Sequence, residues 1–217
     1  MPSQTLYLFS GLGADARVFQ KLTFGNNNPV FINWIVPEKD ELLSHYAGRL
    51  LSQLTAPNPV LIGLSFGGLV AVEVAKQLAT EKVILLISVK TRSELPPYFR
   101  AFGRTGLQRV LPAGLAKKPN RIKDWAFGIT SPQTKKLLAE ILHDTDPQFL
   151  RWAVGQLLRW QNKTVLPNLV HIHGNADRLL PIRFVEANYE IADGGHLMPL
   201  DKAEEISALL QKIIGNP

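Results

Sequence analysis

Apolar strand-like segments alternate with helical patterns through the first 89 residues, and this alternation limits the fold more than any other feature of the sequence. The expected strands are Thr5–Phe9, Val30–Val36, Val60–Leu64 and Lys82–Val89, and the expected helices are Asp40–Leu54 and Phe66–Ala79. Strands that alternate with helices pair in parallel, and strands that are buried on both faces are continuously apolar, as these are. The sequence therefore predicts an α/β fold on a mostly parallel sheet flanked by helices.

Between residues 90 and 163 the strand pattern gives way to short helical patterns separated by Pro and Gly. This stretch holds 14 Lys and Arg against 5 Asp and Glu, whereas the rest of the chain holds 10 against 13. The expected helices are Pro96–Gly103, Gln108–Leu115, Ile122–Phe127, Pro132–His143 and Pro147–Gln161. We interpret residues 90–163 as a helical insertion into one α/β domain formed by residues 1–89 and 164–217.

Strand patterns return after the insertion. Leu169–His173 and a shorter segment around Ala187–Ala192 complete a sheet of about six strands, and Ala203–Ile214 is the expected terminal helix. A length of 217 residues with 46% apolar residues is sufficient for one ordinary core.

The positive charge of the insertion has two interpretations. It forms either a solvated helical surface or a basic surface that attracts an anionic substrate or partner. Nucleic acid is not an expected partner, because the sequence contains no zinc finger, RNP signature or clear helix-turn-helix pattern.

The absence of cysteine excludes disulfides, thiolate metal sites, iron–sulfur clusters and a cysteine nucleophile. No apolar run approaches the roughly 20 residues that a membrane-spanning helix needs, and the N-terminus lacks the basic region of a signal peptide. We therefore expect a cytoplasmic protein without integral membrane association, and the sequence leaves its oligomeric state open.

The segment from Gly63 to Gly68 matches the pattern G-x-S-x-G with Ser65 at its centre. The serine lies where an expected strand ends and an expected helix begins, which is the setting of a nucleophile elbow. Such a turn strains the serine backbone and presents its hydroxyl above the sheet edge at a helix N-terminus. An ordinary glycine-rich turn is the alternative.

A serine hydroxyl needs a base to become a nucleophile, and the sequence has five histidines. His45 and His143 lie in expected helices. His171 and His173 lie on one face of an expected strand, but no further ligand joins them at metal-binding spacing. His196 lies in a glycine-rich loop after the last expected strand, at the sheet edge where active sites of open α/β folds lie. We therefore predict that His196 is the base and that no metal is bound.

The carboxylate that orients the base is expected to be Asp177, on the loop after the strand Leu169–His173. Glu94, which follows the expected strand Lys82–Val89, is the alternative. Asp193, three residues from His196, is expected to cap its own turn.

Attack on a carbonyl also requires donors for the negatively charged oxygen. The backbone N–H of Phe66, directly after the serine, is one candidate. The N–H of Leu12, in the glycine turn after the first strand, is the other.

Together these segments resemble the α/β-hydrolase superfamily. Ser10–Gly13 resembles its oxyanion loop, Gly63–Gly68 its elbow, His173–Pro181 its acid loop and Gly194–His196 its histidine loop. The resemblance implies an α/β-hydrolase fold in which residues 90–163 form a helical lid, and a catalytic triad of Ser65, Asp177 and His196. Ser10 replaces a histidine that many relatives carry in the oxyanion loop.

The expected function is hydrolysis of a small ester or thioester through an acyl-enzyme, without a cofactor. The basic insertion favours an anionic substrate. Three alternatives stay open: superfamily lyase or C–C bond chemistry on the same triad, a non-catalytic binding protein, and a basic surface module that docks to an acidic partner.

Overall fold

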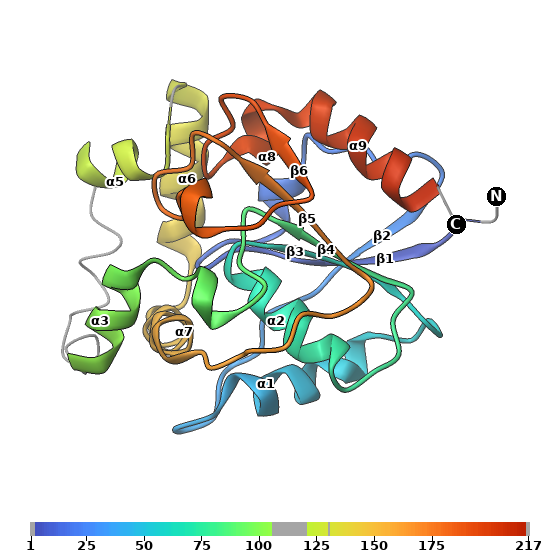
Figure 1. The fold of residues 1–217 in the computed structure, drawn as a ribbon, viewed down its shortest axis with the longest axis horizontal. Helices are drawn as coiled ribbons and strands as arrows, with labels where there is room; N and C mark the ends of the chain where they lie inside the picture. The colour runs from blue at the N-terminus through green and yellow to red at the C-terminus, as the bar shows by residue number, and fades with distance from the viewer. Residues whose placement is uncertain (1–2, 106–120, 130, 216–217) are drawn as a thin grey trace.

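The protein folds around a six-stranded sheet with the order β2-β1-β3-β4-β5-β6 (Figure 1). The structure is a computed structural model that describes residues 3–105, 121–129 and 131–215. All five neighbouring pairs are parallel, in agreement with the predicted α/β fold. The strands are β1 (Thr5–Phe9), β2 (Asn28–Phe31), β3 (Val60–Leu64), β4 (Lys82–Leu86), β5 (Leu169–Gly174) and β6 (Tyr189–Ile191).

Each face of the sheet is covered by helices (Figure 1). The helices α1 (Leu43–Leu50) and α2 (Phe66–Ala75) cover one face, where Tyr7 and Phe9 of β1 belong to their core cluster. The helix α9 (Ala203–Gly215) covers the other face, and Leu6 and Leu8 of β1 belong to the core cluster on that face. Neighbouring strand residues point to opposite faces, so a continuously apolar strand supplies both cores.

Three strands are shorter than predicted. The expected strand Val30–Val36 begins earlier and pairs only over Asn28–Phe31, because β1 ends at Phe9 and leaves later residues without a partner strand. The expected strand Lys82–Val89 ends at Leu86, since Ile87 has a φ of 50°, which a β-strand cannot accommodate. The last strand is likewise limited to Tyr189–Ile191.

The expected helices of the first third are present with shorter ends, whereas the expected terminal helix Ala203–Ile214 extends to Gly215. The predicted helix Asp40–Leu54 is α1 followed by the 3₁₀ turn η2 (Leu51–Gln53), and the predicted Phe66–Ala79 ends at Ala75. The short elements that were not predicted are η1 (Ala16–Phe19), η3 (Arg92–Glu94), η5 (Ile182–Phe184) and α8 (Met198–Asp201). No helix in the described ranges is long and apolar enough to span a bilayer.

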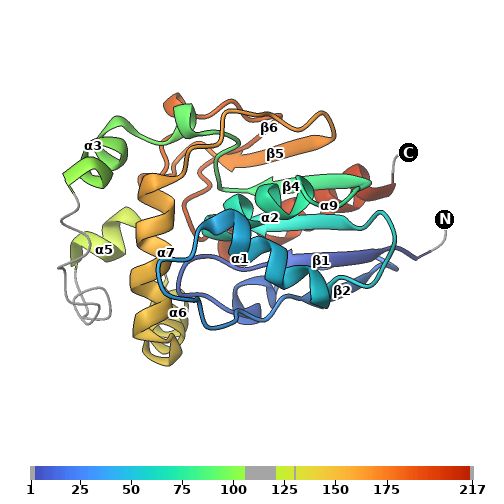
Figure 2. The same cartoon turned by 90° about the horizontal axis from the view of Figure 1, so that it is seen from below.

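The described part of the stretch 90–163 contains helices joined by turns, and no strand (Figure 2). Its helices are α3 (Pro97–Thr105), α5 (Arg121–Ala126), α6 (Pro132–Asp144) and α7 (Pro147–Arg159). They gather at the carboxyl ends of the strands, and α3 packs against α7. The predicted helix Gln108–Leu115 lies outside the described residues. The division of the chain into a core and an inserted lid stays a prediction.

Candidate active site

Ser65 lies on a strained turn between β3 and α2. Its backbone has φ 52° and ψ −119°, a combination that non-glycine residues seldom adopt. Any side chain at Gly67 would collide with the carbonyl oxygens of Phe9 and Ser10, and a Cβ at Gly63 would meet the backbone of Gly68. The glycines therefore permit the close approach of strand and helix on which this turn depends.

The neighbouring strand holds the Ser65 backbone in place. The Ser65 N–H donates to the Leu86 carbonyl at 3.0 Å, and the Ser88 hydroxyl donates to the Ser65 carbonyl at 2.7 Å. Both main-chain groups of the strained residue are thus engaged, so the side chain is presented from a defined backbone position.

Ser65, His196 and Asp177 form one chain of hydrogen bonds, although they come from three separate loops. Ser65 Oγ lies 3.0 Å from His196 Nε2, and His196 Nδ1 lies 2.8 Å from Asp177 Oδ2. Both His196 and Asp177 are 4% exposed. An ionised carboxylate can only accept, so Nδ1 carries a proton and the Nε2 lone pair faces the serine hydroxyl.

The second oxygen of Asp177 is held by its own loop. Asp177 Oδ1 accepts the N–H groups of Leu179 at 2.7 Å and Leu180 at 3.0 Å. Burial alone would raise the pKa of Asp177, but the charge and hydrogen bond of His196 and the Leu180 N–H outweigh it, and the net pKa is lowered. The carboxylate is therefore ionised at neutral pH.

The alternative acid, Glu94, serves another part of the structure. Its carboxylate accepts the backbone N–H of Lys90 at 2.6 Å and that of Glu186 at 3.1 Å, and it lies 3.4 Å from Lys90 Nζ. The structure therefore brings Asp177, and not Glu94, to His196 Nδ1. Asp193 is exposed on its turn, with φ 54°.

A pair of buried histidines, His171 and His173, lies next to Asp177. His173 Nε2 donates to the Leu180 carbonyl at 2.7 Å and lies 3.6 Å from Asp177 Oδ2. His173 Nδ1 lies 3.2 Å from His171 Nε2, and no partner is found for the buried His171 Nδ1 in the part of the chain that is described. Burial lowers the pKa of both rings, and that of His171 falls well below 6.5. Both histidines are therefore neutral at pH 7.

In the described part of the chain, neither of these histidines belongs to a cluster of possible metal ligands. The one such cluster among the described residues is Glu38, Glu41 and His45. Arg49 Nη1 lies 2.9 Å from Glu41 and Arg49 Nε lies 3.5 Å from Glu38, so one guanidinium already contacts both carboxylates.

The loop after β1, residues 10–15, lies against Ser65 and carries the predicted donor Leu12. A Cβ placed on Gly11 would be 3.6 Å from the Cβ of Ser65. Phe66 is the first residue of α2, where backbone N–H groups have no partner within the helix. Among the described residues, neither the Leu12 nor the Phe66 N–H has a protein acceptor. Both N–H groups are therefore without an acceptor in the described structure, as their predicted role requires.

Three side-chain donors bond to carbonyl groups of this loop in the described structure. The Ser10 hydroxyl donates to the Ala14 carbonyl at 2.7 Å, as does Trp34 Nε1 at 3.2 Å, and the Thr145 hydroxyl donates to the Gly13 carbonyl at 2.8 Å. Ser10 thus supports the loop from the position where many α/β hydrolases carry histidine. Sequence reasoning did not find Thr145, because no local pattern links it to a loop 132 residues away.

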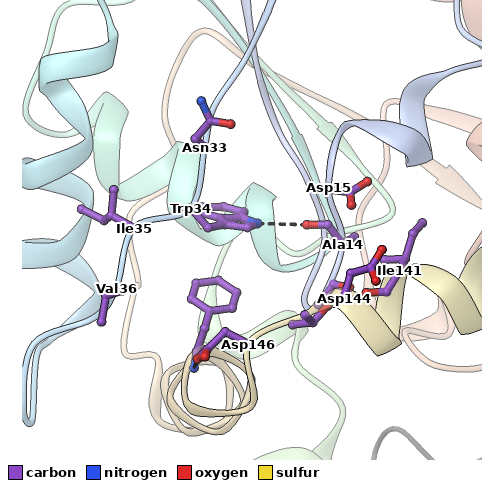
Figure 3. A pocket seen from close by; sticks show the side chains of 12 residues that line it. Ala14, Asp15, Asn33, Trp34, Ile35, Val36, Ile141, Asp144 and Asp146 are labelled. Carbon is purple, nitrogen blue, oxygen red and sulfur yellow. Dashed lines mark hydrogen bonds between the residues drawn. The ribbon is translucent and has the colours of Figure 1, made fainter.

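A cavity of about 290 Å³ adjoins this loop, and we name it the Trp34 pocket (Figure 3). The ring of Trp34 stacks on that of Phe149 at 5.5 Å, and both rings contact Phe66. The pocket therefore shares its aromatic wall with the residue that carries a predicted oxyanion donor. Sequence reasoning placed Trp34 in a strand and missed this position.

Three carboxylates, those of Asp15, Asp144 and Asp146, border the Trp34 pocket (Figure 3). Each of them already has a partner. Arg17 lies 2.7 Å from both Asp15 and Asp144. Hydrogen bonds from Arg17 and His143 hold the pKa of Asp144 below its usual value. Asp146 caps α7 by accepting the Phe149 N–H at 2.7 Å.

Comparison with known proteins addresses the fold and the family. The model of the alpha/beta hydrolase family matches residues 12–209. A comparison with curated proteins finds no match.

Similar solved structures carry titles with different activities. A bromoperoxidase from Bacillus anthracis has a TM-score of 0.74 at 16% identity, over 99% of this chain and 93% of that chain. The esterase EaEST from Exiguobacterium antarcticum has a TM-score of 0.73 at 15% identity, over 100% and 94% of the two chains. MenH from S. aureus has a TM-score of 0.69 at 15% identity, over 99% and 95%. At these identities the likeness establishes the fold alone.

Proposed function

The chain belongs to the alpha/beta hydrolase family, and from this premise we propose that it is a serine hydrolase that cleaves a carboxylic ester or thioester through an acyl-enzyme. The observation that carries the proposal is the unbroken contact from Ser65 Oγ through His196 to Asp177, at 3.0 and 2.8 Å. A base within hydrogen-bonding distance of a serine on a strained turn, itself held by a buried carboxylate, is the arrangement that activates a hydroxyl.

In the first step, His196 Nε2 takes the Ser65 proton as Oγ attacks the carbonyl carbon. The carbonyl oxygen becomes an oxyanion that accepts the Leu12 and Phe66 N–H groups. The resulting imidazolium is stabilised by the ionised Asp177, and it then gives its proton to the leaving alcohol or thiol as the carbonyl bond to that group breaks.

In the second step, water attacks the acyl-enzyme while His196 takes its proton. The bond between Ser65 Oγ and the acyl carbon breaks, and the proton returns to Ser65 as the acid is released. The chemistry uses this chain's own groups throughout, and we propose no cofactor.

We further propose that the helical insertion 90–163 acts as a lid over Ser65. The Phe127 ring lies edge-on to His196 at 5.5 Å, which places the insertion beside the proposed base. The Thr145 hydroxyl donates to the Gly13 carbonyl, so the insertion also contacts the proposed oxyanion loop. A substrate at Ser65 would thus be enclosed by the same helices that support the loop.

The test is labelling with a fluorophosphonate probe, read by intact mass. We expect one adduct on the wild type and none on Ser65→Ala, followed by turnover of p-nitrophenyl esters or acyl thioesters by the wild type alone. An adduct without ester or thioester turnover would favour lyase or C–C bond chemistry on the same triad. No adduct on folded wild type would contradict an activated Ser65 and favour a binding protein.

The charge of the substrate needs a separate comparison. The basic insertion supports an anionic ester or thioester, because the local positive field raises its rate of encounter. We expect kcat/KM for an anionic ester to exceed that for a neutral ester of equal length, and to fall as salt is added. If kcat/KM were equal for the two esters and did not change with salt, the charge of the substrate would not determine its selection.

A further inference from the structure

A second cavity, of about 620 Å³, is lined by residues other than those of the Trp34 pocket, and we name it the Arg100 pocket. It is bordered by the segment after β4, by α3, by the stretch after α7 and by the loop before β6. Its lining includes no triad residue, neither proposed oxyanion donor and no residue of the Trp34 pocket. It is therefore a separate candidate site.

Positive charge predominates in this lining. The cationic residues are Lys90, Arg92, Arg100 and Lys163, whereas the anionic ones are Glu94 and Glu186. Lys90 Nζ lies 3.4 Å from Glu94 and 3.7 Å from Glu186, so one lysine meets both carboxylates.

The remaining three cations have no anionic partner in the described part of the chain. Arg92 Nη1 donates to the Trp160 carbonyl at 2.9 Å. Arg100 Nε is buried without any hydrogen-bond partner among the described residues. A buried guanidinium donor without an acceptor costs free energy, so the position of Arg100 is not explained by the protein contacts described.

The walls of the Arg100 pocket are joined by short hydrogen bonds. The buried Asn162 donates its amide to the Lys90 carbonyl at 2.7 Å, and the Arg92 N–H donates to the Asn162 carbonyl at 2.8 Å. The cationic segments are thus fixed to each other before any ligand arrives, which lowers the entropy cost of binding.

From this geometry we infer that the Arg100 pocket binds a small oxyanion with two negative charges, such as a phosphate group or a dicarboxylate. Arginine presents a planar fork of donors that matches such oxygens, and the hydroxyl groups of Thr91 and Ser93 lie in the same lining. The inference concerns binding and does not depend on the chemistry at Ser65.

Isothermal titration calorimetry with inorganic phosphate tests it, with sodium chloride at matched ionic strength as the reference. We expect saturable binding by the wild type and affinity about tenfold weaker in Arg100→Gln, because a charge-assisted, two-pronged contact is lost. Lys163→Gln, which removes an exposed point charge, is expected to weaken binding about threefold.

Arg151→Gln is the matched control, since Arg151 is exposed on α7 and does not line the pocket. The thermal midpoint of each variant without phosphate shows whether it is folded. Succinate in place of phosphate distinguishes a dicarboxylate from a phosphate site, and saturable binding of either supports the inference. No binding of either beyond the chloride reference, or equal loss in Arg151→Gln, would overturn it.

Discussion

The two sides of Ser65 are built differently. On the oxyanion side, the loop after β1 and the Trp34 pocket have partners for their charged groups, and Arg17 alone engages Asp15 and Asp144. On the histidine side, titratable groups are stacked inside the protein. There, His171 Nδ1 and Arg100 Nε are two of the three buried polar side-chain atoms without a partner among the described residues.

This difference shows that a charged residue in a pocket lining does not by itself indicate a binding site, because its charge can already be paired within the protein. The three carboxylates of the Trp34 pocket have partners, whereas Arg100 Nε has no acceptor among the described residues. We therefore expect substitutions or pH changes that alter charge to have their main effects on the histidine side, and substitutions that alter packing to have theirs on the oxyanion side.

The largest effect is expected from Asp177→Asn. The amide cannot stabilise the imidazolium and favours the wrong tautomer of His196, so kcat for ester hydrolysis should fall roughly 1,000- to 10,000-fold. Glu94→Gln is the matched comparison, with a change of less than about tenfold expected because Glu94 binds Lys90 and Glu186 instead. Fluorophosphonate labelling rates measure both variants, and a larger loss in Glu94→Gln would make Glu94 the acid.

On the oxyanion side, Phe149→Ala is expected to lower the free energy of unfolding by about 3–5 kcal/mol. Phe149 is 5% exposed and its ring contacts Trp34, Phe66 and Trp152, so the truncation leaves a cavity. Urea unfolding measures the change. Trp125→Ala, at a residue that is 60% exposed, should cost less than about 1 kcal/mol. Equal costs would remove the distinction between the two aromatic positions.

Acid should destabilise the histidine side first. The pKa values of His171 and His173 are lowered from 6.5, so the unfolded chain binds more protons and stability falls as pH drops below about 6.5. The slope is up to about 1.4 kcal/mol per pH unit for each histidine. The pKa of Asp177 is also lowered, but its contribution is lost only as pH falls below its ordinary value of 3.8.

Urea unfolding from pH 7 to pH 5 checks this expectation. His171→Leu should flatten the slope, because it removes one of the two buried histidines that gain a proton on unfolding. A wild-type stability that does not vary over this range would contradict buried, neutral histidines.

The smallest effect is expected from Thr145→Val, which removes the hydroxyl that contacts the Gly13 carbonyl. A hydrogen bond worth about 1 kcal/mol corresponds to a roughly fivefold slower labelling of Ser65 if it positions the loop. Thr134→Val, on the same helix and bonded to Asp201 instead, is the control and should leave labelling unchanged. Similar rates in both variants would mean that Thr145 has only a structural role.

The parts of the fold that the sequence predicted best have local signals. Val60–Leu64 is buried at every residue, so its apolar run coincides with the strand. Lys82–Val89 was predicted too long because an apolar run does not reveal the left-handed Ile87. The glycine loops that hold Ser65, Asp177 and His196 were recognisable from composition and chain order, and the structure brings these three side chains together.

The supports of the site carry no such signal. Trp34 continues an apolar run in the sequence, yet it lies beyond the end of β2, and its indole N–H donates to the Ala14 carbonyl. Thr145 follows an ordinary helix end in the sequence, and only the folded structure brings the Gly13 carbonyl to its hydroxyl. Arg100 is an ordinary helix residue in the sequence, and only the folded structure leaves its Nε without an acceptor among the described residues. Contacts between residues more than a hundred positions apart depend on the tertiary arrangement, which periodicity does not encode.

The order of the sheet also bears on how copies of the chain meet. Its outermost strands in the described structure are β2, which contains Pro29, and β6, which has three residues. A proline has no N–H to offer, and a three-residue strand presents few open backbone groups, so neither margin is a good template for another strand. We therefore expect concentrated preparations to resist the edge-to-edge pairing that leads to fibrous aggregation.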